Sequence, residues 1–267
     1  MPNVAYFTHQ DADIAAEITR HAPASYRVTT HAMSLSDDEK SPIVAEVDYL
    51  ILFPGRITEP LLRAGKSLRL IQLVSAGYEH MPLPLCRELG IPVANNGGTN
   101  STDVAEHTVA LILAQYRRMV ELDRKMRADP TLDVPVARST YTVDGKTVGI
   151  IGLGNIGTKV ARLARAFGAN VIYADEAPAD LARDADLGIR RVDLPDLLAA
   201  SDVVTLHVPL APSTDGLIGA AALERMKSSA ILVNTCRGRV VDEAALIEAL
   251  RAGGIAGAAL DVLEREP

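Results

Sequence analysis

Short apolar runs alternate with helix-like patterns along almost the whole chain of 267 residues. Alternating strands and helices build a parallel sheet, because each helix is the crossover that returns the chain to the start of the next strand. The pattern therefore predicts an α/β fold. In the first third, strands are expected at Val4–Thr8, Arg27–Thr30, Tyr49–Phe53, Leu70–Val74 and Ile91–Ala94, and helices near Asp11–His21, Glu59–Ala64 and Met81–Leu89.

The alternation restarts at Thr147–Ile151, and the chain is long enough for two domains. We place the boundary near Gly98 and expect one long helix over Ser101–Met126, where apolar residues recur at helical spacing. The domains are thus 1–98 and 99–267. Later strands are expected at Asn170–Ala174, Asp202–His207, Ala230–Asn234 and Ile255–Leu260, with helices at Asn155–Phe167, Leu194–Ala200, Ala220–Met226 and Asp242–Arg251.

Composition narrows the possible partners. The formal net charge is -7 and no block of lysine and arginine stands out, so neither a nucleic acid nor an anionic membrane surface is an expected partner. No stretch approaches the roughly 20 apolar residues that span a bilayer. The start, Met1–His9, lacks the basic segment of a secretory signal, and Cys86 and Cys236 form no C-x-x-C pair. We expect a cytoplasmic protein without a metal site.

A glycine-rich loop follows the strand Thr147–Ile151. Gly152, Gly154 and Gly157 form G-x-G-x-x-G, and Asn155 and Ile156 begin the helix after it. The first glycine permits a tight turn, the second lets a pyrophosphate approach the backbone, and the third lets helix and strand pack closely. The helix N-terminus offers amides and partial positive charge to phosphates. The loop therefore predicts dinucleotide binding, although glycines alone also mark ordinary turns.

An acidic residue stands where a dinucleotide ribose is expected. Asp175 ends the second strand of this domain, eighteen positions past Gly157, and Glu176 follows it. A carboxylate there accepts ribose hydroxyls and repels a 2′-phosphate, and the adjacent Ala177-Pro178 supplies no arginine. These residues predict NAD rather than NADP. The alternative is that Asp175 is a helix cap or a solvated turn residue.

Several motifs in sequence order resemble one family. They are Val74-Ser75-Ala76-Gly77, Val104-Ala105-Glu106-His107-Thr108, Leu206-His207-Val208-Pro209-Leu210, Asn234-Thr235-Cys236-Arg237-Gly238-Arg239-Val240-Val241-Asp242 and Ala259-Leu260-Asp261-Val262-Leu263-Glu264-Arg265-Glu266-Pro267. Together they resemble the D-isomer-specific 2-hydroxyacid dehydrogenases, and the resemblance extends over essentially the whole chain. It implies two doubly wound parallel-sheet domains: a flavodoxin-like substrate domain and a Rossmann NAD-binding domain.

The resemblance implies that Arg237 and Glu266 are catalytic. A guanidinium can hold a substrate carboxylate and polarise the neighbouring carbonyl, which suits Arg237, although an exposed loop arginine in a surface ion pair is the alternative. Glu266 is expected to hold and tune a histidine, unless it is only a solvated residue before a proline. The loop Ser75-Ala76-Gly77 is expected to bind the substrate carboxylate through backbone amides, although an ordinary turn explains it nearly as well.

The resemblance also implies a cofactor side. Asp261 is expected to accept the nicotinamide carboxamide, unless it is a turn residue at a strand end. Cys236 is expected to form a wall of the nicotinamide pocket rather than an activated thiolate, and His207 to be cofactor-side structure rather than the acid. His107 is expected to be a packing or helix-helix residue. The implied cofactor-binding residues further include Pro209, Thr214 and Thr235.

In the resembled family, the proton-donating histidine follows the Glu-Pro motif, and a terminal helix then completes the first domain. The sequence stops at Pro267, so we expect both features to be missing from the chain as given, with uncertain activity. The favoured function is an oxidoreductase that transfers a hydride between NAD(H) and a small D-2-hydroxy or 2-oxo acid. The alternative is a catalytically weak NAD-binding regulator or scaffold. The long helix predicts a homodimer, because the family's equivalent helix crosses a two-fold interface.

Overall fold

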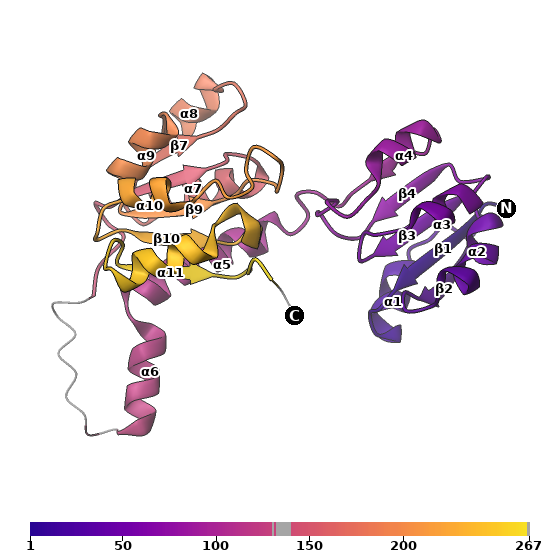
Figure 1. Cartoon of the computed structure of the whole chain (residues 1–267), viewed down its shortest axis with the longest axis horizontal. Helices are drawn as coiled ribbons and strands as arrows, with labels where there is room; N and C mark the ends of the chain where they lie inside the picture. The colour runs from indigo at the N-terminus through magenta and orange to yellow at the C-terminus, as the bar shows by residue number, and fades with distance from the viewer. Residues whose placement is uncertain (130, 132–139, 266–267) are drawn as a thin grey trace. The chain divides into compact units, whose positions relative to one another are not determined.

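A computed structural model describes residues 1–129, 131 and 140–265 (Figure 1). The chain divides into two units, Met1–Thr99 and Asn100–Pro267, one residue after the boundary proposed from the sequence. Each unit contains its own parallel sheet with helices.

Unit 1 is built on a five-stranded parallel sheet in the order β2-β1-β3-β4-β5. This order is that of a flavodoxin-like doubly wound sheet, which confirms the predicted fold class. All five strands lie where the alternation of apolar runs predicted them. Their bounds are β1 Asn3–Thr8, β2 Arg27–Ala32, β3 Tyr49–Phe53, β4 Leu70–Leu73 and β5 Val93–Ala94.

One helix of unit 1 was missed in the sequence. α2 (Asp37–Ala45) contains Pro42 and has almost no apolar face, so the periodicity gave no signal. Its start is nevertheless encoded, because Ser36 and Glu39 form a reciprocal capping box in which each side chain accepts the other residue's backbone amide. The other helices of unit 1 are α1 Ala12–Thr19, α3 Glu59–Ala64 and α4 Leu83–Glu88.

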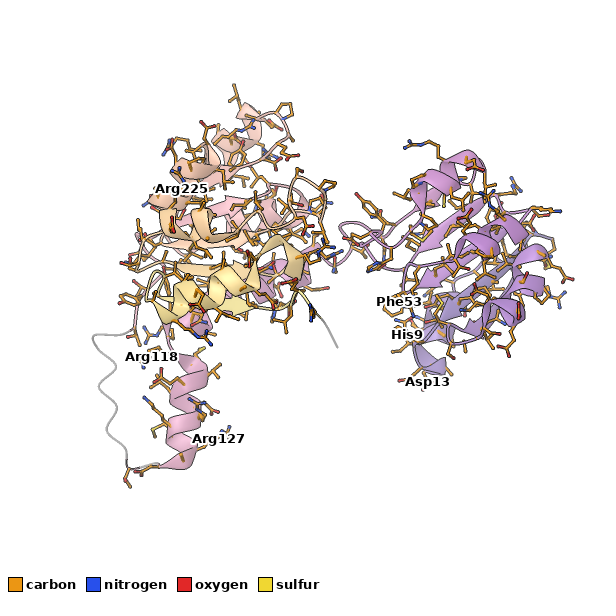
Figure 2. All side chains as sticks on the ribbon, viewed as in Figure 1. His9, Asp13, Phe53, Arg118, Arg127 and Arg225 are labelled. Atoms are coloured by element: carbon orange, nitrogen blue, oxygen red, sulfur yellow. The ribbon has the colours of Figure 1, made fainter. Side chains whose placement is uncertain are left out.

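The two faces of this sheet are covered unequally. On one face, Phe7, Leu50 and Ile71 are buried against apolar residues of α2, α3 and α4. On the other face, a cavity of about 580 Å³ is lined by sheet residues including Val4 and Tyr49 together with residues of α1 and the turn after it. Where β1 and β3 end, the rings of His9 and Phe53 meet edge to face, 5.2 Å apart (Figure 2).

Unit 2 is built on a six-stranded parallel sheet in the order β11-β10-β9-β6-β7-β8. Counted from the first strand of the unit, this is the Rossmann order, with the switch point between β6 and β9. The prediction of two doubly wound sheets is thereby confirmed. The strands are β6 Thr147–Ile151, β7 Asn170–Ala174, β8 Arg190–Arg191, β9 Val203–Leu206, β10 Ile231–Asn234 and β11 Gly257–Leu260.

Both faces of the second sheet are buried. Successive residues of β10 alternate between two cores: Ile231 and Val233 pack with α5 and α7, whereas Leu232 packs with α9, α10 and α11. Burial on both faces explains why the strands read as continuous apolar runs in the sequence. The helices of this unit, apart from α6, are α5 Ser101–Tyr116, α7 Asn155–Ala166, α8 Leu181–Leu187, α9 Leu194–Ala200, α10 Ala220–Arg225 and α11 Glu243–Arg251, with the 3-10 turn η1 Gly238–Val240.

The single long helix predicted over Ser101–Met126 is wrong. Arg118 adopts a left-handed conformation (φ 53°, ψ 36°) and separates α5 from α6, Met119–Ala128. Helical periodicity does not reveal such a break, since the apolar spacing continues through it. Figure 1 shows α6 standing clear of the rest of unit 2, and none of its residues is buried. None of the helices in the described ranges is long and apolar enough to cross a membrane.

Asp202 joins three strands of unit 2 at their amino ends. Its Oδ2 accepts the Thr147 amide at 2.9 Å, and its Oδ1 accepts the Lys227 ammonium at 2.9 Å. Its carbonyl accepts the amide of Ile231, the first residue of β10. Burial alone would raise the pKa of Asp202, but the Thr147 amide and Lys227 outweigh it and hold the pKa below its ordinary value.

Asp202→Asn should therefore lower the free energy of unfolding of unit 2 by about 1–2 kcal/mol at pH 7, since charge-assisted hydrogen bonds are lost. A carboxylate with a lowered folded-state pKa stabilises the protein above the unfolded pKa, and this stabilisation is lost as the pH falls through the folded pKa. The free energy of unfolding of wild type, measured with urea, should therefore fall more steeply below about pH 4 than that of the variant. Asp196→Asn, on an exposed position of α9, is the control. Equal pH profiles for wild type and Asp202→Asn would contradict the prediction.

Candidate active site

A cavity of about 400 Å³ opens at the carboxyl ends of β6, β7, β8 and β9. Open α/β sheets bind their ligands at this edge, next to the switch point. Six of the predicted cofactor-binding residues line it, and Asn155 and Ile156 begin α7 beside it. Those among its lining residues are Gly152, Gly154, Asp175, His207, Pro209 and Thr214.

The glycine loop is shaped by close backbone contacts. Gly152 has φ +91°, and a Cβ on it would lie 2.6 Å from the carbonyl oxygen of His207. A Cβ on Gly157 would lie 2.1 Å from the carbonyl oxygen of Gly152, so α7 can pack on the loop only with glycine there. Gly154 differs, because a Cβ on it would meet nothing within 4 Å. The space above Gly154 and the start of α7 at Asn155 fit a pyrophosphate.

Asp175 is fixed at the rim of the cavity. Its Oδ2 accepts the Leu153 amide at 2.6 Å, and its Oδ1 accepts the Ala177 amide at 2.7 Å. The carboxylate thus holds both the glycine loop and the turn after β7. A carboxylate oxygen can accept further hydrogen bonds, so the ribose hydroxyls of a dinucleotide fit this position.

Arg183 and Asp184 of α8, which the sequence did not single out, lie next to the glycine loop and the strand beside it. Arg183 donates to the carbonyl oxygen of Leu153 at 3.3 Å, and its guanidinium lies over the ring of Tyr173. The Tyr173 hydroxyl donates to the buried carboxylate of Asp184 at 2.6 Å. Neither residue belongs to the G-x-G-x-x-G pattern, so only the packing of α8 on β7 reveals them.

His207 lies in the wall of the cavity, at the end of β9. Its Nε2 is 3.0 Å from the Thr205 hydroxyl, and its buried Nδ1 has no hydrogen-bond partner among the described residues. Burial lowers the pKa of His207 to about 3, so the ring is neutral at physiological pH. A neutral ring suits a structural wall rather than a proton donor. The unpartnered nitrogen also fits a polar group of a bound cofactor.

Pro209 and Thr214 form the loop after β9. The Thr214 hydroxyl donates to the Pro209 carbonyl at 2.6 Å and accepts the Ala211 amide at 2.8 Å. This pairing closes the loop over one side of the cavity. Thr214 therefore shapes the wall while its own hydroxyl is engaged within the loop.

Arg237 stands on a turn after β10 that is organised by Asn234, a buried residue without an assigned role in the sequence analysis. The Asn234 side chain donates to the Arg237 carbonyl at 2.9 Å and accepts the Cys236 amide at 3.0 Å. Arg237 is half-buried, and its Nη1 donates to the Cys236 carbonyl at 2.6 Å. A Cβ on Gly238 would lie 1.9 Å from the carbonyl of Leu263, so the segment after β11 passes directly against this turn.

The thiol of Cys236 is not activated. Burial is the main influence on it and raises its pKa, and the thiol contacts the Asn234 side-chain oxygen at 3.1 Å. Both features favour a protonated sulfur at neutral pH. They agree with the interpretation of Cys236 as a wall residue.

Thr235 and Asp261 follow β10 and β11 and are contacted by neighbouring residues of α5. The Thr235 and Thr108 hydroxyls are 3.0 Å apart and buried, and the His107 Nε2 is 3.2 Å from the Asp261 Oδ1. His107 therefore pairs with a predicted cofactor residue and is not simply a packing residue. The cavity described above is not lined by Thr235, Cys236 or Asp261, which lie along the same sheet edge beyond β9.

The predicted carboxylate-binding loop belongs to unit 1. Ser75, Ala76 and Gly77 follow β4, and the Ser75 hydroxyl donates to the Gly77 carbonyl at 2.9 Å. Asn95 donates to the Ala76 carbonyl at 2.7 Å, and the Asn96 amide to the Ser75 carbonyl at 3.1 Å. Glu266 lies outside the described residues. Within those residues, no group of three or more histidine, cysteine or acidic side chains could hold a metal ion.

Comparisons with known proteins show which family the chain resembles. Residues 109–267 match the NAD-binding domain of the D-isomer specific 2-hydroxyacid dehydrogenases. The chain is 40% identical over 227 residues to a glyoxylate reductase of Korarchaeum cryptofilum, which covers 84% of this chain and 68% of that protein. It is 34% identical over 263 residues to a hydroxypyruvate reductase of Thermotoga maritima, covering 98% and 84%. The crystal structure of D-lactate dehydrogenase with NAD+ from Lactobacillus jensenii matches with TM-score 0.82 and 28% identity, covering 98% and 79%.

The chain thus belongs to the D-isomer-specific 2-hydroxyacid dehydrogenase family, as its motifs predicted. Unit 2 is the NAD-binding domain, and membership makes the protein an NAD-dependent oxidoreductase of the 2-hydroxyacid class. The predictions of family, fold class and cofactor are confirmed. The roles of the individual site residues stay predictions.

The two glycines of the loop should respond differently to an added methyl group. Gly154→Ala has room for its Cβ and an extended backbone, so its thermal midpoint should stay within about 2 °C of wild type. Its methyl group should block the pyrophosphate, weakening NAD binding at least tenfold, or about 1.4 kcal/mol. Gly157→Ala should lose both stability and binding because its Cβ meets backbone. Thermal melts and calorimetric NAD titration measure both quantities, and tight NAD binding by Gly154→Ala would refute the placement of the phosphates.

Proposed function

We propose that the protein reduces small 2-oxo acids to D-2-hydroxy acids with NADH and catalyses the reverse oxidation. The observation that carries this proposal is the position of Arg237, on a turn held rigid by the buried Asn234 at the carboxyl edge of the NAD-binding sheet. When bound, the cofactor would supply the hydride as NADH, or accept it as NAD+ in the reverse direction. The names of the relatives, glyoxylate reductase and hydroxypyruvate reductase, support short 2-oxo acids as substrates.

The proposed role of Arg237 follows from the charges of the substrate. A 2-oxo acid carries a carboxylate next to the carbonyl that is reduced, and the carbonyl oxygen gains negative charge as the hydride adds to carbon. A guanidinium keeps its charge at any physiological pH and can bind both oxygens through its fork of donors. Arg237 would thus orient the acid and stabilise the developing alkoxide.

We also propose roles for the other predicted site residues. The backbone amides of Ser75, Ala76 and Gly77 bind the substrate carboxylate, and unit 1 is accordingly the substrate domain. Glu266 is proposed to hold the imidazole of the proton-donating histidine, which the family resemblance places after the Glu-Pro motif and therefore after Pro267, the last residue of the sequence given. In the reduction, the carbonyl carbon would gain a hydride from NADH, which becomes NAD+, and the carbonyl oxygen would gain a proton from that histidine, so atoms and charge balance. Thr235 and Asp261 contact the nicotinamide end of the cofactor.

Arg237→Ala should reduce kcat/KM by at least about 10²-fold while changing NAD affinity little, because the charge acts on the substrate carbonyl. Arg237→Lys should recover little, since an ammonium lacks the planar fork. Arg239→Ala is a matched control: it lies in the same turn, is exposed and pairs with Asp215. The assay follows NADH oxidation with glyoxylate and hydroxypyruvate in an active form of the protein. Near wild-type turnover of the lysine variant would show that Arg237 supplies only charge.

We also propose a homodimer formed through α6, in a cytoplasmic protein. Met119, Leu122 and Met126 form one stripe at helical spacing, and Met119, Val120 and Met126 are 55%, 76% and 47% exposed. Ion pairs of Glu121 and Asp123 with basic residues lie on the same helix, so α6 is amphipathic, and none of its residues is buried by the part of the chain that the structure describes. A second copy related by two-fold symmetry would cover such a stripe with an identical one. Both cysteines are free and buried, which fits a reducing compartment.

Met119→Glu combined with Met126→Glu should convert the dimer into a monomer, because four carboxylates would face one another across the two-fold axis. Leu181→Glu is the control, since Leu181 is exposed on α8 and lies outside the stripe. Light scattering at micromolar concentration should give a dimer mass for wild type and the control. A monomeric wild type would refute the proposed dimer.

A further inference from the structure

An arginine reaches the cavity from a strand that the sequence analysis did not identify. Arg191 is the last residue of β8 and pairs in register with Tyr173 of β7, two residues before Asp175. Its Nη2 donates to the main-chain carbonyl of Asp175, and the residue lines the cavity. In the sequence the two residues are sixteen positions apart. Ala177-Pro178 supplies no arginine beside Asp175 in the sequence, but the fold brings Arg191 to it.

The charges around this part of the cavity are mixed. Asp175, Glu176 and Asp193 contribute carboxylates to its lining, and Arg191 is the only permanent cation among the described lining residues. NAD and NADP differ by one phosphate on the adenosine ribose, and a phosphate monoester carries about −1.5 to −2 charges at pH 7. In Rossmann sheets an acid at this position accepts the ribose hydroxyl, whereas a nearby arginine accommodates the phosphate. This cavity contains both groups.

We propose that Arg191 is a specificity-determining residue: it is the cationic half of a 2′-phosphate site that the Asp175 carboxylate suppresses. The inference rests on the proposed function only in that the cavity must receive the adenosine ribose of NAD. It goes beyond that function because it assigns cofactor discrimination to a balance between two residues. The Asp175 carboxylate outweighs the Arg191 guanidinium in this balance, and so favours NAD, because two backbone amides fix the carboxylate in place.

Removal of the carboxylate would change the site in two ways. The Leu153 and Ala177 amides would lose their acceptor and could donate to a phosphate. Arg191 would keep its position, since its bond is to the main-chain oxygen of Asp175 and does not depend on the side chain. A guanidinium has five N–H donors, so one bond to a carbonyl leaves donors for a phosphate. Both changes would favour binding of a 2′-phosphate at the position where the Asp175 carboxylate repels it.

The test measures binding to the whole chain by calorimetry, with NAD+, NADP+ and 2′,5′-ADP as ligands. Wild type should bind NAD+ at least tenfold more tightly than NADP+. Asp175→Ser should gain at least tenfold in affinity for NADP+ and 2′,5′-ADP. Adding Arg191→Gln should abolish that gain, whereas adding Arg190→Gln should preserve it, because Arg190 is exposed on the same strand and does not line the cavity.

Asp175→Asn is a second variant that keeps an acceptor for the loop amides, so a folding defect of the serine variant does not end the test. Thermal melts establish that each variant is folded. The proposal is overturned if folded variants gain no affinity for 2′-phosphate ligands, or if the gain survives Arg191→Gln. Failure of wild type to bind NAD+ at all is a different outcome, since it would overturn the proposed cofactor site itself.

Discussion

The close approach of three backbone segments at the glycine loop is the constraint on which unit 2 depends. The loop passes under the His207 carbonyl at Gly152, and α7 packs on the loop at Gly157, where even a methyl group would lie within 2.6 Å and 2.1 Å of carbonyl oxygens. These contacts set the distance between β6, β9 and α7. They also direct the first turn of α7 at the cavity and leave open space beside Gly154. The phosphate site is thus a consequence of packing that only glycine permits.

Asp175 connects this packing to recognition. Its carboxylate binds the loop amide of Leu153, so the residue that would select the ribose also holds the loop that would receive the phosphates. Arg191 holds the main chain of the same residue from the neighbouring strand. Loop geometry and charge at the rim are therefore coupled, and a substitution at Asp175 acts on both. Because of this coupling, weaker NAD+ binding after a substitution at Asp175 could reflect either a disturbed loop or a lost contact to the ribose. Comparing NAD+ with NADP+, which differ by one phosphate, separates these two causes.

The sequence predicted the features that depend on residues close together along the chain. Both sheets follow from apolar runs, the glycine loop from its spacing, and Arg237 from a contiguous motif. The features that it did not reveal depend on contacts between distant segments or on short elements. β8 has two residues and too little apolar pattern to detect, and so Arg191 was missed although it lies beside Asp175. The break at Arg118 was missed because a left-handed residue other than glycine leaves no compositional mark. α2 was signalled by its capping box alone, since Pro42 and a weak apolar face hide it from periodicity.

α5 shows how far such distant contacts extend. The helix begins two residues after the division between the units, and its adjacent residues His107 and Thr108 contact Asp261 and Thr235. Farther along the helix, Gln115 donates to the Ala258 carbonyl of β11. One helix is therefore tied to the ends of both β10 and β11, which carry residues proposed for the nicotinamide end. The motif Glu106-His107-Thr108 is a family feature on a helix that does not line the cavity, and its contacts give a physical reason for its composition. His107 pairs with the exposed carboxylate of Asp261 at the end of β11. Thr108 gives the buried hydroxyl of Thr235, at the end of β10, a hydrogen-bond partner. The first helix of unit 2 thus supports the sheet edge where we place the nicotinamide.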